Sequence, residues 1–222
     1  IWIQKGSTGN IISNTTIKNS SLAILIDGTG DEVTPSLTLK NVQIYNSQAA
    51  GIQANATYIE AENLAINQSG QASLNIEQGG TYNFNHCTIV NYFRFGFRSL
   101  TAVNLSNSIR TDSDVTNTNL NALFTNCIIS GNNQTELTLR KSEDADFTFK
   151  FENCLIFANE NLNDGADSEY NFDNLDLYEN CVFNEDPMFK NTGLNQLQIN
   201  EESAANGIAK IPTLATDITG TA

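Results

Sequence analysis

The sequence predicts an all-β solenoid, and three observations support this prediction. A short unit centred on asparagine recurs along the chain at intervals of 19 to 27 residues, a period typical of proteins whose repeats stack on one another. Apolar residues stand at alternate positions in several segments, for example Phe147, Phe149 and Phe151, as they do in strands. No segment sustains a helical period over three turns.

Each repeat unit combines a polar centre with apolar residues at fixed offsets. The residue two places before the centre is mostly apolar, and the residue three places after it is aliphatic or aromatic except where Arg110 stands. Asparagine tolerates the left-handed backbone conformation, so this column predicts a sharp bend between two short strands. The unit centres are Asn14, Asn41, Asn63, His86, Asn107, Asn126, Asn153 and Asn180.

Identical bends stack when the chain coils, with each strand about 4.8 Å above the one before it in parallel register. The 222 residues then form one domain of about eight to ten coils, a rod roughly 40–50 Å long. The single histidine, His86, replaces asparagine in the bend column, and we assign it a structural role.

Two further patterns carry a resemblance to a known family. The phrases FTNCIISGN, FENCLIFAN and YENCVFNED repeat one another, and the chain ends with Asp186-Pro187-Met188-Phe189, a later Ser203-x-Ala205-Asn206-Gly207 and Asp217-x-x-Gly220. The sequence resembles the right-handed parallel β-helix family of bacterial secreted and cell-surface proteins, in the pectate-lyase-like superfamily. This resemblance implies β-helix coils over 1–185 and a closing segment of the same domain over 186–222.

The charge of the chain limits its partners. The formal net charge is -14 and the pI is about 4.2, with only 11 basic residues. Nucleic acid and anionic membrane surfaces are therefore unfavourable partners. No stretch reaches the length of a membrane-spanning helix. We expect an extracellular or cell-surface protein, of which this chain is an excised or processed part, and the sequence leaves its oligomeric state open.

The four cysteines favour packing over disulfide bonds. Cys87, Cys127, Cys154 and Cys181 all directly follow a unit centre. Stacked side chains that run parallel do not meet the geometry of a disulfide, so we expect free, buried thiols. Their spacing does not suit a zinc site.

The acidic residues gather between the apolar phrases, where they form solvated loops or a metal site. The segment from Asn159 to Glu169 offers oxygens at alternate positions, and calcium takes six to eight oxygen ligands. Asp164, Asp167 and Glu169 are the candidate calcium ligands, although the spacing departs from that of an EF-hand. The sequence indicates no other cofactor.

One stretch combines aromatic and basic residues. If residues 91–98 form a strand, Phe93, Phe95 and Phe97 point into the core, and Tyr92, Arg94 and Arg98 point outward. The outward side chains form a candidate carbohydrate-binding surface, because tyrosine stacks on sugar rings and arginine pairs with carboxylates. With Arg110, expected one coil further along, Arg94 and Arg98 are also the candidate catalytic residues of a lyase.

Two functional hypotheses follow. The first is a non-catalytic structural or glycan-binding module of a larger protein, similar to a stalk or an adhesin, because no acid and base are paired in the sequence. The alternative is a lyase or glycoside hydrolase that acts on acidic polysaccharide, as the resemblance to pectate lyases implies. A glycosidase needs two convergent acids, and the sequence alone does not show which acids converge.

Overall fold

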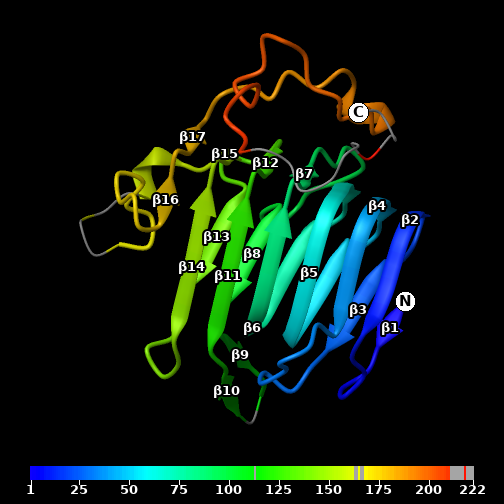
Figure 1. The fold of residues 1–222 in the computed structure, drawn as a ribbon, viewed down its shortest axis with the longest axis vertical. Helices are drawn as coiled ribbons and strands as arrows, with labels where there is room; N and C mark the ends of the chain where they lie inside the picture. The colour runs from blue at the N-terminus through cyan, green and yellow to red at the C-terminus, as the bar shows by residue number, and fades with distance from the viewer. Residues whose placement is uncertain (113, 163–164, 166–167, 211–217, 219–222) are drawn as a thin grey trace.

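The computed structural model describes residues 1–112, 114–162, 165, 168–210 and 218. These residues form a parallel β-helix with three faces, along each of which the strands of successive coils pair (Figure 1). The longest strands bend around the corners between faces, so one strand can belong to two or three of them. Fifteen strands join in one continuous sheet.

The three faces are named here by their strands. Face A contains the first parts of β2 (Asn10–Lys18) and β4 (Leu37–Ser47), the middle of β5 (Ile52–Ser69), the second part of β6 (Leu74–Asn85), then β11 (Leu120–Thr125), β14 (Phe147–Glu152) and β16 (Tyr178–Glu179). Face B contains the last parts of β2, β4 and β5, then β7 (Thr88–Asn91), β12 (Ile128–Gly131), β15 (Leu155–Ile156) and β17 (Val182–Phe183). Face C contains β1 (Trp2–Ile3), β3 (Ile24–Asp27), the first parts of β5 and β6, then β8 (Val103–Ser106) and β13 (Leu137–Arg140).

The predicted bend column forms the corner between faces A and B. Seven of the eight predicted centres have a positive φ, between 48° for Asn14 and 57° for Asn126. In the first coils the bend side chains also bond to one another: Asn41 Nδ2 donates to Asn14 Oδ1 at 3.0 Å, and Asn63 Nδ2 donates to Asn41 Oδ1 at 3.1 Å. The bend and its amide ladder therefore confirm the repeat.

Asn107 is not a bend, which corrects the predicted column. It is absent from the residues with positive φ, and it precedes β9 (Ser108–Arg110), which forms a separate hairpin with β10 (Val115–Asn117). The next coil on face A resumes at β11, where Phe124 pairs directly with Phe84. Asn107 instead binds the following loop, donating from Nδ2 to Ser142 O at 2.9 Å. The described solenoid thus has seven bends, fewer than the eight to ten coils expected.

A second column of left-handed residues, which the sequence analysis did not identify, lies at the far end of face B. Asn19, Asn46, Gln68 and Asn184 have φ between 58° and 61°. Asn46 Nδ2 donates to Asn19 Oδ1 at 3.2 Å, so this corner also carries an amide contact between coils.

The core is built from stacked columns of identical positions. Phe84, Phe124, Phe151 and Tyr178 form one aromatic stack with centroid separations of 5.1, 4.9 and 5.6 Å. The four cysteines are free thiols, as predicted, and Cys87, Cys127 and Cys154 are buried. Burial raises the pKa of the Cys127 thiol, which keeps it in the protonated form of a small core residue.

A loop that carries Tyr170 and Phe172 covers the core at the last coil. Phe172 packs against Phe183 at 4.6 Å and against Tyr178 at 5.3 Å between ring centroids. The hydroxyl of Tyr170 accepts a hydrogen bond from Leu139 N at 2.8 Å, which fixes the loop to the preceding coil. This cover therefore comes from the residues around Tyr170 and Phe172, and the described part of 186–222 lies elsewhere.

We expect Phe151→Ala to lower the free energy of unfolding by about 3–5 kcal/mol, because it removes a fully buried ring from the middle of the stack. Urea denaturation followed by circular dichroism measures this change. Phe95→Ala is the matched control, since Phe95 is 85% exposed, and it should change stability by less than about 0.5 kcal/mol. Equal losses in the two variants would contradict the stacked core.

Candidate functional site: a groove on face B

The outer surface of face B changes from polar to apolar along the solenoid. The register aligns one outward row across the coils: Thr16, Gln43, Ala65, Thr88, Ile128, Leu155 and Val182. Leu155 is only 1% exposed, although it points away from the core. A second layer of chain must therefore cover the later part of this face.

That layer is the segment from 184 to 210, called the strap below. It leaves the last coil, crosses face B as far as the end of β5, turns through the 3-10 helix η2 (Thr192–Leu194) and returns (Figure 1). Backbone hydrogen bonds between Asn191 and Gln196 hold the turn. The part of the predicted closing segment up to residue 210 thus lies along the flank of the solenoid, over face B.

The two bend columns hold the strap in place. At its turn, Gln68 Nε2 of the second column donates to Thr192 O at 3.2 Å, and the neighbouring Asn67 Nδ2 donates to Thr192 O and to Asn195 Oδ1, both at 2.9 Å. On its return, Ile208 O accepts from Asn153 Nδ2 at 2.7 Å, and Lys210 N donates to Asn126 Oδ1 at 2.8 Å. The later bend asparagines therefore bind the strap, whereas the earlier ones bind each other.

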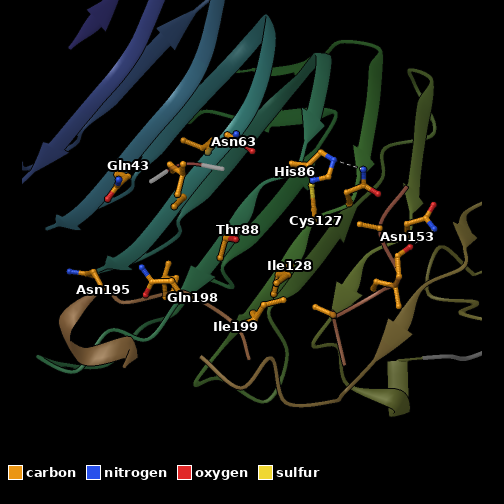
Figure 2. A pocket seen from close by; sticks show the side chains of 18 of the residues that line it. Gln43, Asn63, His86, Thr88, Cys127, Ile128, Asn153, Asn195, Gln198 and Ile199 are labelled. Atoms are coloured by element: carbon orange, nitrogen blue, oxygen red, sulfur yellow. Dashed lines mark hydrogen bonds between the residues drawn. The ribbon is translucent and has the colours of Figure 1, made fainter. Parts of the chain in front are cut away.

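A groove of about 570 Å³ lies between face B and the strap (Figure 2), a size typical of ligand pockets. The described residues that line it carry neither a carboxylate nor a lysine or arginine, in a chain of net charge -14. They are Gln43, Tyr45, Asn63, Leu64, Ala65, His86, Thr88, Asn126, Cys127, Ile128 and Asn153 from the coils, with Asn195, Leu197, Gln198, Ile199, Ala205, Ile208, Ala209 and Ile218 from the C-terminal segment.

Amides, a hydroxyl and a phenol supply the polar groups of this groove. Gln43 and Thr88 stand on the outward row of face B, and Gln198 faces them from the strap (Figure 2). Tyr45 is half-buried, and desolvation raises its pKa to about 12, so its hydroxyl remains a neutral donor and acceptor. Such groups bind hydroxyl-bearing ligands and offer no strong base.

His86 also lines the groove, and its imidazole is the basic side chain among the described lining residues. Asn126 Nδ2 lies 2.9 Å from His86 Nε2, and because an amide nitrogen only donates, Nε2 must accept and the imidazole is neutral. Burial lowers the pKa of His86, and the Glu62 carboxylate opposes this shift. His86 therefore continues the bend ladder as a neutral acceptor, in agreement with its predicted structural role.

The structure brings Tyr92 and Arg94 together beside the strap. The Tyr92 ring meets Phe189 edge-on at 6.1 Å, and its hydroxyl lies 3.0 Å from Ser130 Oγ. Arg94 Nη2 donates to Thr192 Oγ1 at 3.3 Å. Both side chains therefore stand next to the turn of the strap.

Arg98 does not face solvent, which corrects the predicted orientation of this stretch. Strand β7 ends at Asn91, and the chain then loops outward, so the alternation of a strand does not apply. Phe95 and Phe97 are 85% and 90% exposed, whereas Arg98 is 4% exposed and bonds to Glu136 through both terminal nitrogens, at 2.5 and 3.1 Å. Its guanidinium is therefore occupied by a buried carboxylate and does not face a ligand.

The remaining predicted site residues that the structure describes, Arg110 and Glu169, do not line the groove. Arg110 ends β9 in the hairpin with β10, at the opposite end of the view from β7 (Figure 1). Of the candidate calcium ligands, Asp164 and Asp167 fall outside the described residues, and Glu169 forms an ion pair with Lys141 at 3.3 Å. No group of three or more metal-binding side chains occurs in the part of the chain that the structure describes.

The sequence analysis missed the groove residues Gln43, Tyr45 and Thr88. A signal was present in the repeated phrases, where Asn-Cys precedes two aliphatic residues. Ile129 points into the core and is fully buried, so its neighbour Ile128 must point outward. An apolar residue on both sides of a strand indicates that both sides are covered.

We expect His86 to make the stability of the fold depend on pH. The pKa of His86 is lower in the folded state than its value of about 6.5 in an unfolded chain. Its contribution to stability is therefore complete above the unfolded pKa and is lost as the pH falls through the folded pKa. Thermal unfolding between pH 5 and 8 measures this effect.

The His86→Asn variant is the control, because it restores the residue of the other bends without a titrating group. The difference in unfolding temperature between wild type and this variant should change as the pH falls below about 6.5. A difference that stays constant across the range would contradict the neutral-acceptor role of His86.

We expect Arg98→Met to lower the free energy of unfolding by about 3–5 kcal/mol, because it leaves the fully buried Glu136 carboxylate without its partner. The double variant Arg98→Met with Glu136→Met should be more stable than this single variant. Chemical denaturation of the three proteins measures the coupling. Additive losses would show that the two side chains act independently.

Comparison of the chain with known proteins yields no relative from which a function can be transferred. No protein-family description, no curated protein and no solved structure matches the sequence or the fold. Among the residues that the structure describes, no helix has the length and apolar character needed to cross a membrane. What the chain does must therefore be argued from the groove itself.

Proposed function

We propose that this chain is a glycan-binding module whose ligand lies in the groove between face B and the strap. The observation that carries the proposal is that the described residues lining the groove bear no carboxylate, lysine or arginine, in a strongly acidic chain. Gln43, Asn195 and Gln198 each offer a donor and an acceptor, which suits the hydroxyl groups of a sugar. Apolar neighbours such as Ile128 and Ile199 suit the C–H faces of its ring.

The charge distribution supports a neutral glycan. A site for uronates or sulfated sugars needs cations that pair with the ligand's anions, and the described lining residues supply none. The net charge of -14 also repels a polyanion at long range. A neutral ligand avoids both penalties.

The same observations favour binding over catalysis at the groove. A glycosidase needs two carboxyl groups at a fixed separation, and a lyase that acts through arginine needs that side chain free. The described lining carries no carboxylate, Arg98 is paired with Glu136, and Arg110 lies in the β9–β10 hairpin. A lyase or hydrolase acting on acidic polysaccharide is therefore the less supported alternative.

We also propose a cellular location and a superfamily for this protein. The parallel β-helix, the repeated Asn-Cys phrases and the acidic composition support membership of the pectate-lyase-like superfamily and a secreted or cell-surface location in bacteria. We propose that the rod presents its groove to glycans outside the cell.

We expect the protein to bind a neutral polysaccharide on an array that contains neutral and acidic glycans. Tyr45→Ala and Gln43→Ala should each weaken binding of that glycan about tenfold, because each removes a contact of roughly 1.4 kcal/mol. Isothermal titration calorimetry measures the affinity. Thr16→Ala is the matched control, since Thr16 occupies the same outward row one coil before Gln43 and does not line the groove.

Two results would contradict the proposal. One is wild-type protein that binds no glycan on the array. The other is the appearance of new reducing ends or of unsaturated uronate absorbance when the protein is incubated with a glycan, because either signal would establish catalysis.

A further inference from the structure

The loop from 92 to 101, called the aromatic loop, displays two phenylalanine rings to solvent. Phe95 is 85% exposed and Phe97 is 90% exposed. Single exposed apolar residues are common on protein surfaces, but two neighbouring aromatic rings with so little cover indicate a contact surface. Phe93 packs against Phe95 at 5.9 Å with an interplanar angle of 75°, which helps to fix the plane of the Phe95 ring.

A buried ion pair anchors this loop on the solenoid. Arg98 Nη2 donates to Asn91 O and to Asn132 Oδ1, both at 3.0 Å, in addition to its bonds with Glu136. The Glu136 carboxylate also accepts from Ala102 N at 2.7 Å, where the loop ends. Arg98 and Glu136 thus connect the start and the end of the loop to the next coil.

The surrounding residues are adapted to this anchor. A Cβ on residue 131 would collide with the Glu136 carboxylate, so the absence of a side chain at Gly131 leaves room for that carboxylate. Asn132 Nδ2 donates to Phe93 O at 2.8 Å and holds the first half of the loop. Ser99 Oγ donates to Gln71 Oε1 at 2.7 Å and holds the second half. The loop is therefore fastened on both sides of its tip, which keeps the rings from folding back onto the protein.

The aromatic loop adjoins the groove through the turn of the strap. Arg94 bonds to Thr192, and a Cβ on Gly193 would lie 2.6 Å from Arg94 Nη1, so the guanidinium packs directly on the strap. Asn67 Oδ1 accepts from Tyr92 N at 3.0 Å, and Asn67 Nδ2 donates to Asn195, which lines the groove. One side chain thus connects the base of the aromatic loop to the groove wall.

We propose that Phe95 and Phe97 form a second subsite, which stacks on the sugar rings of a glycan chain that extends beyond the groove. This inference rests on the proposed function and specifies its ligand as an extended polysaccharide. The loop bears two cations: Arg98 is buried against Glu136, and Arg94 contacts the strap, while the whole chain carries a net charge of -14. An anionic membrane is therefore a poor partner, whereas a neutral sugar ring requires an apolar face of this kind and no charge.

The test compares chain lengths of the neutral glycan selected on the array. Wild-type protein should bind an oligosaccharide of about ten units roughly tenfold more tightly than a disaccharide or trisaccharide of the same glycan. The double variant Phe95→Ala with Phe97→Ala should lose this preference and bind the short ligand as wild type does. Leu175→Ala is the control, because Leu175 is an exposed apolar residue outside the aromatic loop, and it should leave both affinities unchanged.

Three other outcomes overturn the inference, and they can be told apart. Equal affinity of wild type and the double variant for the long ligand rejects the second subsite and leaves the proposed function intact. Failure of wild type to bind any glycan rejects the proposed function together with this inference. Binding of wild type, but not of the double variant, to phosphatidylcholine vesicles assigns the rings to a lipid surface instead.

Discussion

The left-handed bend between faces A and B is the constraint on which the rest of the structure depends. Consecutive coils pair residue for residue in parallel register, so a bend that moved by one position would turn every inward side chain outward. A left-handed residue costs least when it is glycine or asparagine. The ladder from Asn14 through Asn41 to Asn63 stabilises the bend further, because the Asn41 amide donates to one neighbour and accepts from the other.

The groove is a consequence of the same bends. Once the register is set, the outward residues of face B also form rows, and the later members of one row are apolar. The strap covers those residues, and its backbone needs polar partners on a face whose main-chain groups are already paired. The bend amides at Asn126 and Asn153 supply them. The groove lies under this cover and extends along the outward row from Ile128 through Thr88 and Ala65 to Gln43.

The sequence predicts the coils well because the signals of bend and strand are local. The prediction fails where the residues that pair are far apart in the sequence. Asn107 carries the local pattern of a bend, yet Phe84 pairs with Phe124, and His86 contacts its successor Asn126 across 40 residues. Arg110, the one polar residue in an apolar column, was the sign that this unit belongs to a hairpin. The candidate groove was not predicted, because it lies between coils and a strap whose contacts span up to 128 residues.

The aromatic loop shows why alternation alone does not establish a strand. Phe93, Phe95 and Phe97 have the period of a strand, but a strand needs a partner that binds its backbone. In this region Arg98 donates to the carbonyls of Asn91 and Leu100, and Glu136 accepts from Ala102 N, so these two side chains bind the backbone instead. A buried ion pair contributes little net stability compared with apolar packing of the same volume, so its value here lies in fixing one loop conformation. That conformation keeps two phenylalanine rings in water, at a free-energy cost of roughly 1.5–3 kcal/mol each relative to burial. The fold bears this cost beside a groove whose described lining carries no carboxylate, lysine or arginine, and the proposed stacking of these rings on a glycan chain gives that cost a function.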